Sequence, residues 1–434
     1  MRGASQASYT SAMRTGLVVC VLVCASQPAS ADQRYISIGD DAVPMVHELA
    51  LHDHASMKVL DANDTAAVVA IDDSELDRLS EQMHEQFHRC GGFMVHDSRA
   101  EARDAIATHL VDKGPIDYTI DHPETVAAVL PALDRGRILS MIGELQAMKN
   151  RYYRSDTGAA ASLWLRDRWR SLTDRTDVTV TLFDQGYPQK SVILTIPGTT
   201  RANEVVVIGG HLDSIARGGV NADAPGADDD ASGIATLTEV LRVLLAKDFR
   251  PARTLVFMAY AAEEIGLRGS QAIAKDYTKR GINVIGALQL DMTNYQGSDK
   301  DIWLMKDFTD AKQNAFLTQL IDRYVGATWG LDACGYACSD HASWYRAGVP
   351  ASMPFESRMK QYNRSIHTNA DTLERSNNNA DHAIKFARLG AAYAIELAKG
   401  DVPRAPASTD DSSTWKLSAL ALLALAGLIS RRMV

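Results

Sequence analysis

The sequence predicts an α/β fold with a mixed, largely parallel central sheet flanked by helices. Three short runs, at 205–208, 255–258 and 284–290, are apolar at nearly every position, as in strands buried on both faces of a sheet. Helix-like stretches near 232–245 and 270–279 separate them. Two helix-like stretches (126–149 and 158–172) and two strand-like stretches (178–183 and 191–196) come earlier. Because 434 residues exceed the usual size of one hydrophobic core, we expect one large domain over residues 116–402 with accessory segments around it.

Residues 1–31 have the three parts of a secretory signal peptide. A basic residue precedes an apolar run at 17–25, and small residues occupy 29–31. We expect cleavage before Asp32. A lipoprotein signal through Cys24 is the weaker alternative, because a bulky residue stands before the cysteine. The sequence therefore predicts an exported protein, secreted or at the cell surface.

Residues 32–115 are predicted to form a small α/β unit. Strand-like stretches at 66–71 and 93–96 flank a helix-like stretch at 75–88, and Gly114-Pro115 separates the unit from the rest of the chain. We expect this unit to be a pro-segment that is removed during maturation.

The helix of this unit contains His84-Glu85-Gln86-Phe87-His88. This matches the zinc-peptidase pattern H-E-x-x-H, in which the two histidines share one helical face. The extended form of the pattern needs a third histidine where this chain has Met94. Matches of five residues are frequent by chance, so we expect a solvent-exposed helix here rather than a metal site.

The chain after residue 402 is predicted to lie outside the folded domain. Residues 403–416 form a linker rich in Pro, Ala, Ser, Thr and Asp. Residues 417–434 begin with an apolar stretch shorter than the roughly 20 residues that span a membrane, and they contain Arg431-Arg432 near the end. We expect a removable sorting tail, with a frayed apolar helix as the alternative.

The composition excludes some classes of partner. A net charge of −9 disfavours nucleic acid, because a phosphate backbone requires a basic surface. With 46% hydrophobic and 23% charged residues, the chain is neither disordered throughout nor a polytopic membrane protein. We expect membrane contact only through the signal peptide and the tail, and a monomeric domain over 116–402.

Cys334 and Cys338 are predicted to form a disulfide. A turn over Cys334-Gly-Tyr-Ala-Cys338 can bring the α-carbons within the 4.4–6.8 Å that the bond requires. Export to an oxidising compartment favours the bond. Two free thiols are the alternative.

Polar residues suited to metal binding or proton transfer follow the predicted strands, where open α/β sheets place their sites. They are His211 with Asp213, Asp228-Asp229-Asp230, Glu263-Glu264, Asp291 and His367. Each cluster is ambiguous alone, since a histidine is often structural and an acidic run can cap the helix that follows. Three adjacent carboxylates nevertheless repel one another unless a cation is near. Adjacent glutamates point in different directions, so one can bind a metal while the other takes a proton from water. Two histidines and three carboxylates together suit two zinc ions that share one carboxylate.

At these residues the sequence strongly resembles the secreted bacterial leucyl aminopeptidases of the co-catalytic di-zinc exopeptidase family. Among the matching motifs are Gly209-Gly-His-Leu-Asp-Ser214 and Ala259-Tyr-Ala-Ala-Glu-Glu264. The other matching stretches follow in family order at 225–233, 266–270, 288–295, 334–344, 353–357 and 366–368. The resemblance covers about residues 117–399. It implies the zinc-exopeptidase fold, which is phosphorylase/hydrolase-like, and hydrolysis of the N-terminal residue of peptides or proteins.

The resemblance also assigns the ligands of two zinc ions. It makes Asp229 the bridging carboxylate, pairs His211 with Asp291 on one ion, and pairs Glu264 with His367 on the other. The identity of the second histidine rests on this correspondence alone.

Further roles follow from the same correspondence. Glu263 becomes the general base that activates water, and Asp213 accepts a hydrogen bond from the His211 ring. The family has a cis peptide after the bridging aspartate. His341 in Ser339-Asp340-His341 looks like a ligand, but its counterpart in the family does not bind metal, so we expect it to be structural.

The family's specificity pocket implies a preference for leucine-like side chains. Besides the two cysteines it maps onto Met292, Met305, Tyr336, Met353, Phe355, Met359, Tyr362 and Ile366. Met305 and Met359 replace the Ile and Phe expected there, which leaves the side-chain preference open. Zinc carboxypeptidases, deacylases and one-zinc glutaminyl cyclases are the enzyme alternatives, and a non-catalytic receptor is the alternative of another class.

Overall fold

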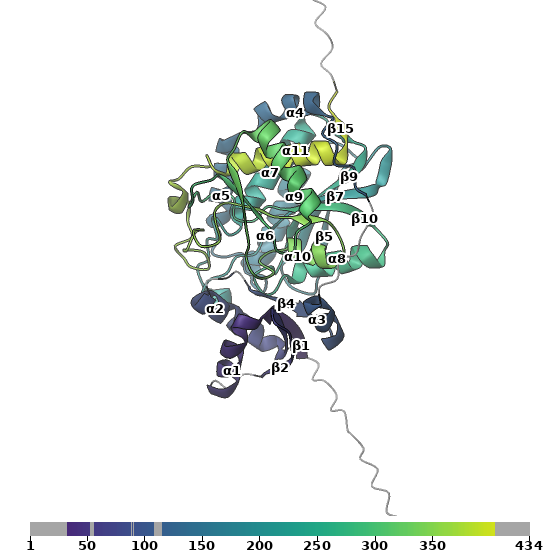
Figure 1. Ribbon diagram of the computed structural model, residues 1–434. Helices are drawn as coiled ribbons and strands as arrows, with labels where there is room; N and C mark the ends of the chain where they lie inside the picture. Colours follow the sequence, from purple (N-terminus) through teal and green to yellow (C-terminus); the bar gives the residue numbers. More distant parts are fainter. Residues whose placement is uncertain (1–32, 53–55, 88, 90, 108–114, 404–434) are drawn as a thin grey trace, which may run out of the picture.

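The computed structural model describes residues 33–52, 56–87, 89, 91–107 and 115–403. A small N-terminal unit lies against one end of a larger domain, below it in Figure 1. The predicted signal peptide, the sorting tail and all but the first residue of the linker fall outside the described residues, as does His88. No helix within the described part is long and apolar enough to cross a membrane.

The large domain is built on a six-stranded mixed sheet, which confirms the predicted fold class. The strand order is β13-β10-β7-β9-β6-β5. The strands are β5 (Thr179–Phe183), β6 (Ser191–Ile196), β7 (Arg201–His211), β9 (Arg253–Tyr260), β10 (Asn283–Gln289) and β13 (Ala351–Ser352). The first four strands in the order pair in parallel, whereas β6 pairs antiparallel with both β9 and β5. The three strongest apolar runs of the sequence are the adjacent strands β7, β9 and β10.

Helices cover both faces of this sheet (Figure 1). On β7, Val206 and Ile208 enter one core while Val205 and Val207 enter the other, because successive side chains of a strand point to opposite faces. The first core contains α5 (Arg135–Gln146), α6 (Asp156–Arg170), α7 (Ala231–Ala246), α9 (Ala311–Leu320) and α11 (Ala383–Ala398). The second contains α8 (Arg268–Lys279) and α10 (His341–Arg346). Strands buried on both faces explain why their sequences are almost uniformly apolar.

The single helix expected over 126–149 is wrong. The chain forms α4 (Pro123–Val129), a 3-10 turn (Leu130–Ala132) and then α5. Pro131 lacks the N–H that a continuing helix requires. Asp134 begins α5 by accepting a hydrogen bond from the Gly136 N–H at 2.7 Å. Apolar spacing alone did not reveal this break.

The N-terminal unit contains a four-stranded antiparallel sheet in the order β2-β3-β1-β4. Its elements are β1 (Gln33–Gly39), α1 (Val43–His52), β2 (Met57–Ala62), β3 (Ala66–Asp72), α2 (Leu76–Phe87), β4 (Phe93–His96) and α3 (Arg99–Ile106). The apolar core of the unit continues into the large domain through Tyr152, Tyr153, Ile215, Ala262 and Ile265. The two parts therefore share one hydrophobic interface.

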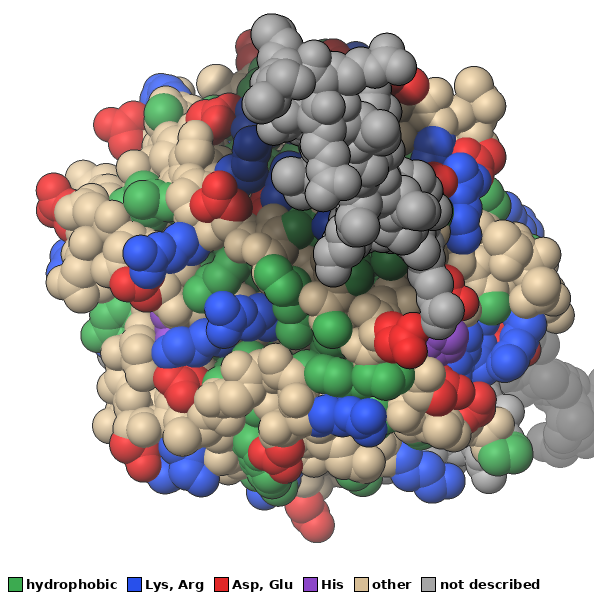
Figure 2. Space-filling model, turned by 90° about the horizontal axis from the view of Figure 1, so that it is seen from above, with side chains coloured by type: hydrophobic (Ala, Val, Ile, Leu, Met, Phe, Trp, Pro, Cys, Tyr) green, Lys and Arg blue, Asp and Glu red, His purple; other side chains and the backbone are tan. Residues whose placement is uncertain are grey.

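Smaller sheets complete the large domain. β11 (Ile302–Met305) lies between parallel β12 (Trp329–Asp332) and antiparallel β14 (Pro354–Phe355). β8 (Arg250–Pro251) pairs with β15 (Gly400–Asp401). On the face opposite the N-terminal unit, acidic and basic side chains are interspersed among the described residues in view (Figure 2).

Candidate metal centre

Three of the sequence-predicted clusters lie at the carboxyl ends of neighbouring parallel strands. His211 is the last residue of β7, Glu263 and Glu264 follow β9, and Asp291 follows β10. Because β7 lies between β9 and β10, these ends meet at one edge of the sheet. His367 reaches the same place from a long loop before α11.

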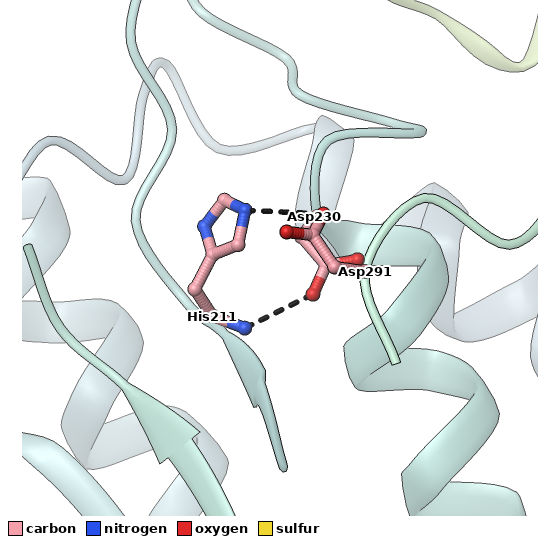
Figure 3. A group of neighbouring side chains, drawn as sticks. All are labelled: His211, Asp230 and Asp291. Carbon is pink, nitrogen blue, oxygen red and sulfur yellow. Dashed lines mark hydrogen bonds and ion pairs between the residues drawn. The ribbon is translucent and has the colours of Figure 1, made fainter. Parts of the chain in front are cut away.

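The acidic run at the start of α7 divides into two roles. Asp230 caps the helix, since its Oδ1 accepts hydrogen bonds from the N–H groups of Gly233 (2.8 Å) and Met292 (3.2 Å). Its Oδ2 accepts the N–H of His211 at 3.0 Å (Figure 3). The Asp229–Asp230 peptide bond is cis, as the resemblance implied. Asp230 is thus occupied by the backbone, and Asp229 is left to face the histidines.

The carboxylate of Asp229 lies between the two histidines. Its Oδ1 is 2.9 Å from His211 Nε2, and its Oδ2 is 3.2 Å from His367 Nε2. His211 Nε2 also lies 3.5 Å from Asp291 Oδ1 (Figure 3), and His367 Nε2 lies 2.7 Å from Glu264 Oε2. The structure therefore contains two histidine-carboxylate pairs that share one carboxylate.

Backbone conformation next to the ligands is unusual. Ala262, Met292 and His367 all have left-handed φ values, of 57°, 55° and 57°. Residues with a side chain rarely adopt this region, and such residues concentrate at functional sites. Each lies at or next to a residue predicted to bind metal or substrate or to act as the general base.

The site is buried and strongly charged. His211 is fully buried and His367 is only 6% exposed. Burial lowers the pKa of His367, but the carboxylates of Glu264 and Asp229 outweigh it and raise the pKa to about 10. Burial also raises the pKa of Glu264 to about 7. The excess negative charge thus draws positive charge into the site, as protons on the histidines or as metal ions.

The donor set fits zinc. Both oxygens of Glu263 and one oxygen of Asp291 are buried and accept no hydrogen bond from the described residues. Buried carboxylate oxygens are normally paired, so oxygens of this kind point to a cation or water. Imidazole nitrogens with carboxylate oxygens are ligands that zinc prefers.

Sequence comparison identifies the family. Residues 191–392 match the model of Peptidase family M28. Leucine aminopeptidase 1 of Uncinocarpus reesii is 36% identical over 331 residues, which cover 72% of this chain and 82% of that protein. The homologue with the same name from Pyrenophora tritici-repentis is 38% identical over 321 residues, covering 67% and 80%. The chain belongs to peptidase family M28.

Solved structures agree with this assignment. The LapA aminopeptidase of Legionella pneumophila is 28% identical with a TM-score of 0.74, and LapB of the same organism is 29% identical with a TM-score of 0.72. Both matches cover 84% of this chain, and they cover 98% and 99% of the Legionella chains. Residues 116–402 are only about two thirds of the chain, so both matches extend into the N-terminal unit.

This M28 chain is a metallo-aminopeptidase, because its family and its leucine aminopeptidase relatives agree with its metal-binding groups. M28 aminopeptidases depend on zinc. The two relatives named above are fungal and the two structures named above come from Legionella, so the bacterial origin that the resemblance implied stays a prediction.

Asp213 binds mainly to the backbone of the glutamates. Its Oδ1 accepts the N–H of Glu263 at 3.0 Å and its Oδ2 accepts the N–H of Glu264 at 3.1 Å. His211 Nδ1 lies 3.1 Å from the main-chain oxygen of Asp213 and 3.5 Å from its carboxylate. Asp213 therefore links the orientation of the His211 ring to the position of both glutamates.

The eight residues expected to bind substrate lie in one apolar cluster next to Asp291. All eight belong to the same cluster, and six of them line a small cavity there. Those six are Met292, Tyr336, Met353, Phe355, Met359 and Tyr362. Trp303 is an additional member of the cluster. The alternation of β11 could have revealed it, because Trp303 and Met305 are two residues apart and share a face.

The disulfide between Cys334 and Cys338 is present, with an α-carbon separation of 6.2 Å. Cys338 packs in the same cluster, where its Sγ lies 3.9 Å from Met353 Sδ. His341 lies apart from the metal ligands, with its Nε2 3.1 Å from the main-chain oxygen of Asp307. Burial lowers the pKa of His341 to about 4, which keeps this ring neutral.

Two polar residues beside the ligands were not identified from the sequence. Ser339 donates a hydrogen bond to Asp291 Oδ2. Asp371 accepts the N–H groups of Asp228 and Asp229, the latter at 3.1 Å. Ser339 is two residues before His341 and Asp371 is four residues after His367, but no pattern distinguishes them from other Ser and Asp residues.

Helix α2 of the N-terminal unit lies directly over the metal centre. The ring of His84 packs against that of His367 with 4.4 Å between centroids. Ser80 Oγ donates to the main-chain oxygen of Glu264 at 2.8 Å. The solvent-exposed helix expected here is therefore wrong, since Leu76, Leu79, Ser80 and Met83 are buried.

Proposed function

We propose that this M28 peptidase removes N-terminal residues with leucine-like side chains from peptides, using two zinc ions and Glu263 as general base. The observation that supports this most strongly is the position of Asp229. Its two oxygens face different histidines at 2.9 and 3.2 Å, as expected for a carboxylate that bridges two metals.

The ligand pairs follow from the distances. His211 and Asp291 would hold one ion, Glu264 and His367 the other, and Asp229 both. Bound there, the two ions would supply Lewis acidity, which lowers the pKa of a water molecule and polarises the scissile carbonyl.

Glu263 would accept the proton of the attacking water and pass it to the leaving amine. Its side chain is fully buried, and neither oxygen accepts a hydrogen bond from the described residues. Burial raises the pKa of Glu263 well above its usual value, which makes the carboxylate a stronger base. Asp213 accepts the N–H of Glu263 and so fixes the backbone from which this side chain extends.

The apolar cluster beside Asp291 would take the first side chain of the substrate. Met292, Met353 and Phe355 supply an apolar wall there. Burying a leucine side chain is worth about 1.5–3 kcal/mol, so leucine should be favoured over alanine by roughly ten- to a hundredfold in kcat/KM. Met305 and Met359 are flexible and would also admit methionine or phenylalanine.

We also propose that residues 32–115 act as a pro-segment that blocks the site until it is removed. Besides the contacts of His84 and Ser80, Glu81 Oε1 accepts the N–H of Gly218 at 3.1 Å, and Glu85 lies 3.3 Å from Arg217. These contacts cover the glutamates and a loop beside the ligands. A peptide could not reach them while α2 remains in place.

The disulfide supports export, because such bonds persist in oxidising compartments. We propose that the mature enzyme is secreted or held at the cell surface. Removal of residues 1–31 and of the tail at 417–434 would accompany its maturation.

The experiment that tests this function compares free and blocked substrates. The full chain, before and after limited proteolysis of the N-terminal unit, is assayed with leucine p-nitroanilide, with its N-acetylated form and with a carboxypeptidase substrate. We expect hydrolysis of the free-amine substrate alone, an increase after proteolysis, and loss with a zinc chelator. Activity only on the carboxypeptidase substrate would refute the proposal.

A further inference from the structure

Arg151 lies in the connection between α5 and α6 and is fully buried. All hydrogen bonds from its guanidinium to described residues go to main-chain carbonyl oxygens. The acceptors are Leu145 (3.3 Å), Leu212 (2.9 Å), Pro225 (2.6 Å) and Gly226 (2.9 Å). One side chain therefore ties together three separate segments of the domain.

Two of these segments carry predicted metal ligands. Leu212 stands between His211 and Asp213, and Gly226 precedes Asp229 by three residues. The backbone adds a second connection, because the Arg151 N–H donates to Ser214 Oγ at 3.1 Å and that hydroxyl donates to the Ala224 oxygen at 2.8 Å. The loop after β7 and the loop before α7 are thus joined at Arg151.

The backbone of Gly226 packs closely against the guanidinium. Gly226 has a left-handed φ of 49°. A β-carbon there would lie 2.8 Å from Arg151 Nη2 and 2.4 Å from the main-chain oxygen of Asp229. Its carbonyl also accepts the N–H of Ala231 at 3.1 Å, inside the first turn of α7. A shift of the guanidinium would therefore move the backbone that carries Asp229.

The charge of Arg151 also suits this position. A buried cation without a carboxylate partner is costly. Here burial lowers the pKa of the guanidinium, and the nearby carboxylates of Asp230, Asp371, Asp213 and Asp229 oppose that effect. Arg151 is thus a permanent positive charge behind a strongly acidic site.

We propose that Arg151 is a positioning residue that sets the separation of His211 from Asp229 and so fixes the geometry of the zinc site. This inference rests on the proposed function. Lysine keeps the charge, but its three donors all sit on one nitrogen and cannot replace the four bonds that the guanidinium makes from three nitrogens. Residues that orient metal ligands typically change metal affinity or activity by about 10- to 100-fold when they are mutated.

The test compares Arg151→Lys with Arg253→Lys in the full chain after proteolytic activation. Arg253 is the matched control, since it is also buried and also donates to a carbonyl, that of Leu397, but it lies at the far end of β9. Zinc affinity is measured by chelator competition, ligand geometry by the visible spectrum of the cobalt-substituted protein, and kcat and KM with leucine p-nitroanilide at saturating zinc.

For Arg151→Lys we expect zinc affinity about 10- to 100-fold weaker, a changed cobalt spectrum and kcat at least about tenfold lower, with KM within about threefold. Arg253→Lys should keep the wild-type affinity and spectrum. Ser214→Ala removes only the bonds of the Ser214 hydroxyl to the Arg151 N–H and the Ala224 oxygen, and it should change the cobalt spectrum in the same direction. This variant replaces Arg151→Lys in the test if Arg151→Lys does not fold.

The inference is overturned if Arg151→Lys, or in its place Ser214→Ala, keeps wild-type zinc affinity and cobalt spectrum. It is also overturned if Arg253→Lys loses zinc to the same degree, because the effect would then reflect general stability. A wild-type chain that binds no zinc would instead refute the proposed function.

Discussion

Substitution of Glu263 by glutamine separates the proposed general base from the metal ligands. Glutamine has nearly the same shape, and the fully buried carboxylate loses no hydrogen bond from a described residue. Burial and the nearby carboxylates of Asp340, Glu264 and Asp291 disfavour its charge. The neutral substitution should therefore not destabilise the metal-free protein.

Catalysis should respond very differently. Loss of a general base typically costs 10²–10⁴-fold in rate, which corresponds to about 3–5 kcal/mol in the activation barrier. We expect kcat for leucine p-nitroanilide to fall by that factor in Glu263→Gln, with KM within about threefold, because the pocket residues are unchanged. Zinc content, measured by mass spectrometry of the dialysed protein, should stay at the wild-type level.

Glu396→Gln is the matched control. Glu396 lies in α11, away from the metal centre, and is also fully buried. Its carboxylate accepts the N–H groups of Asp121 and His122. It should lower the melting temperature and leave kcat unchanged. The reasoning is refuted if Glu263→Gln keeps kcat within tenfold of wild type, and loss of zinc would show that Glu263 is a ligand. Survival of activity in Glu263→Gln but not in Glu85→Gln would place the site on α2.

Three further predictions concern the ligands, the pro-segment and its stability. His367→Ala should lower zinc content by about one ion per chain, since the histidine belongs to one of the two ligand pairs, whereas His341→Ala should keep it. Asp73→Asn should raise activity of the full chain and speed proteolysis of the N-terminal unit, because Asp73 pairs with Arg154 at 2.8 Å and Arg268 at 3.0 Å of the large domain. Burial lowers the pKa of His96 in β4 to about 3, so the unfolded chain binds a proton below pH 6.5 that the folded unit excludes, and stability falls as pH falls. The loss should be about 2 kcal/mol between pH 7 and 5, and His96→Gln should reduce it in denaturant titrations.

Each of these outcomes has a clear opposite. Equal zinc content in the two histidine variants would remove His367 from the ligand set. Full-chain activity that is unaffected both by Asp73→Asn and by proteolysis would show that the N-terminal unit does not block the site. Unfolding with the same pH dependence in wild type and His96→Gln would assign the acid sensitivity to other groups.

Much of the central sheet could be predicted because burial on both faces leaves a strong signal. The apolar cores of β7, β9 and β10 were found at 205–208, 255–258 and 284–290, but β7 begins at Arg201. Its first three residues are exposed, so they carry no apolar pattern. β5 and β6 were also found, at 178–183 and 191–196, but their antiparallel pairing was not predicted, because strand direction depends on long-range pairing rather than composition.

Without the family resemblance, the residue pattern predicted the ligand set as a group and not residue by residue. Asp229 and Asp230 are adjacent acids before a helix, and the pattern leaves the acidic run divided between metal binding and capping by Asp230 or Ser232. The structure separates them, since Asp230 binds three backbone N–H groups and Asp229 faces His211 and His367. The backbone conformation decides which aspartate caps the helix, and two identical neighbouring residues do not reveal that conformation in the sequence.

The position of α2 had no signal in its own sequence. Its five-residue motif predicts two histidines on one helical face, but the pattern does not say what that face contacts. In the structure the helix places His84 on His367, a predicted ligand from a segment almost three hundred residues later in the chain. The motif lies at the candidate metal centre, yet the predicted ligands there come from other segments.

These cases share a physical cause. Metal ligands are visible in a sequence because histidine and carboxylate side chains next to apolar strands are conspicuous. The groups that hold them act on main-chain atoms, as Arg151 does on four carbonyls and Asp371 on two N–H groups. Every residue has such main-chain atoms, so their partners cannot be recognised until the loops are placed in space. The arginine variants proposed above therefore address the part of the site that the sequence could not reveal, and the Glu263 variant addresses the part that it could.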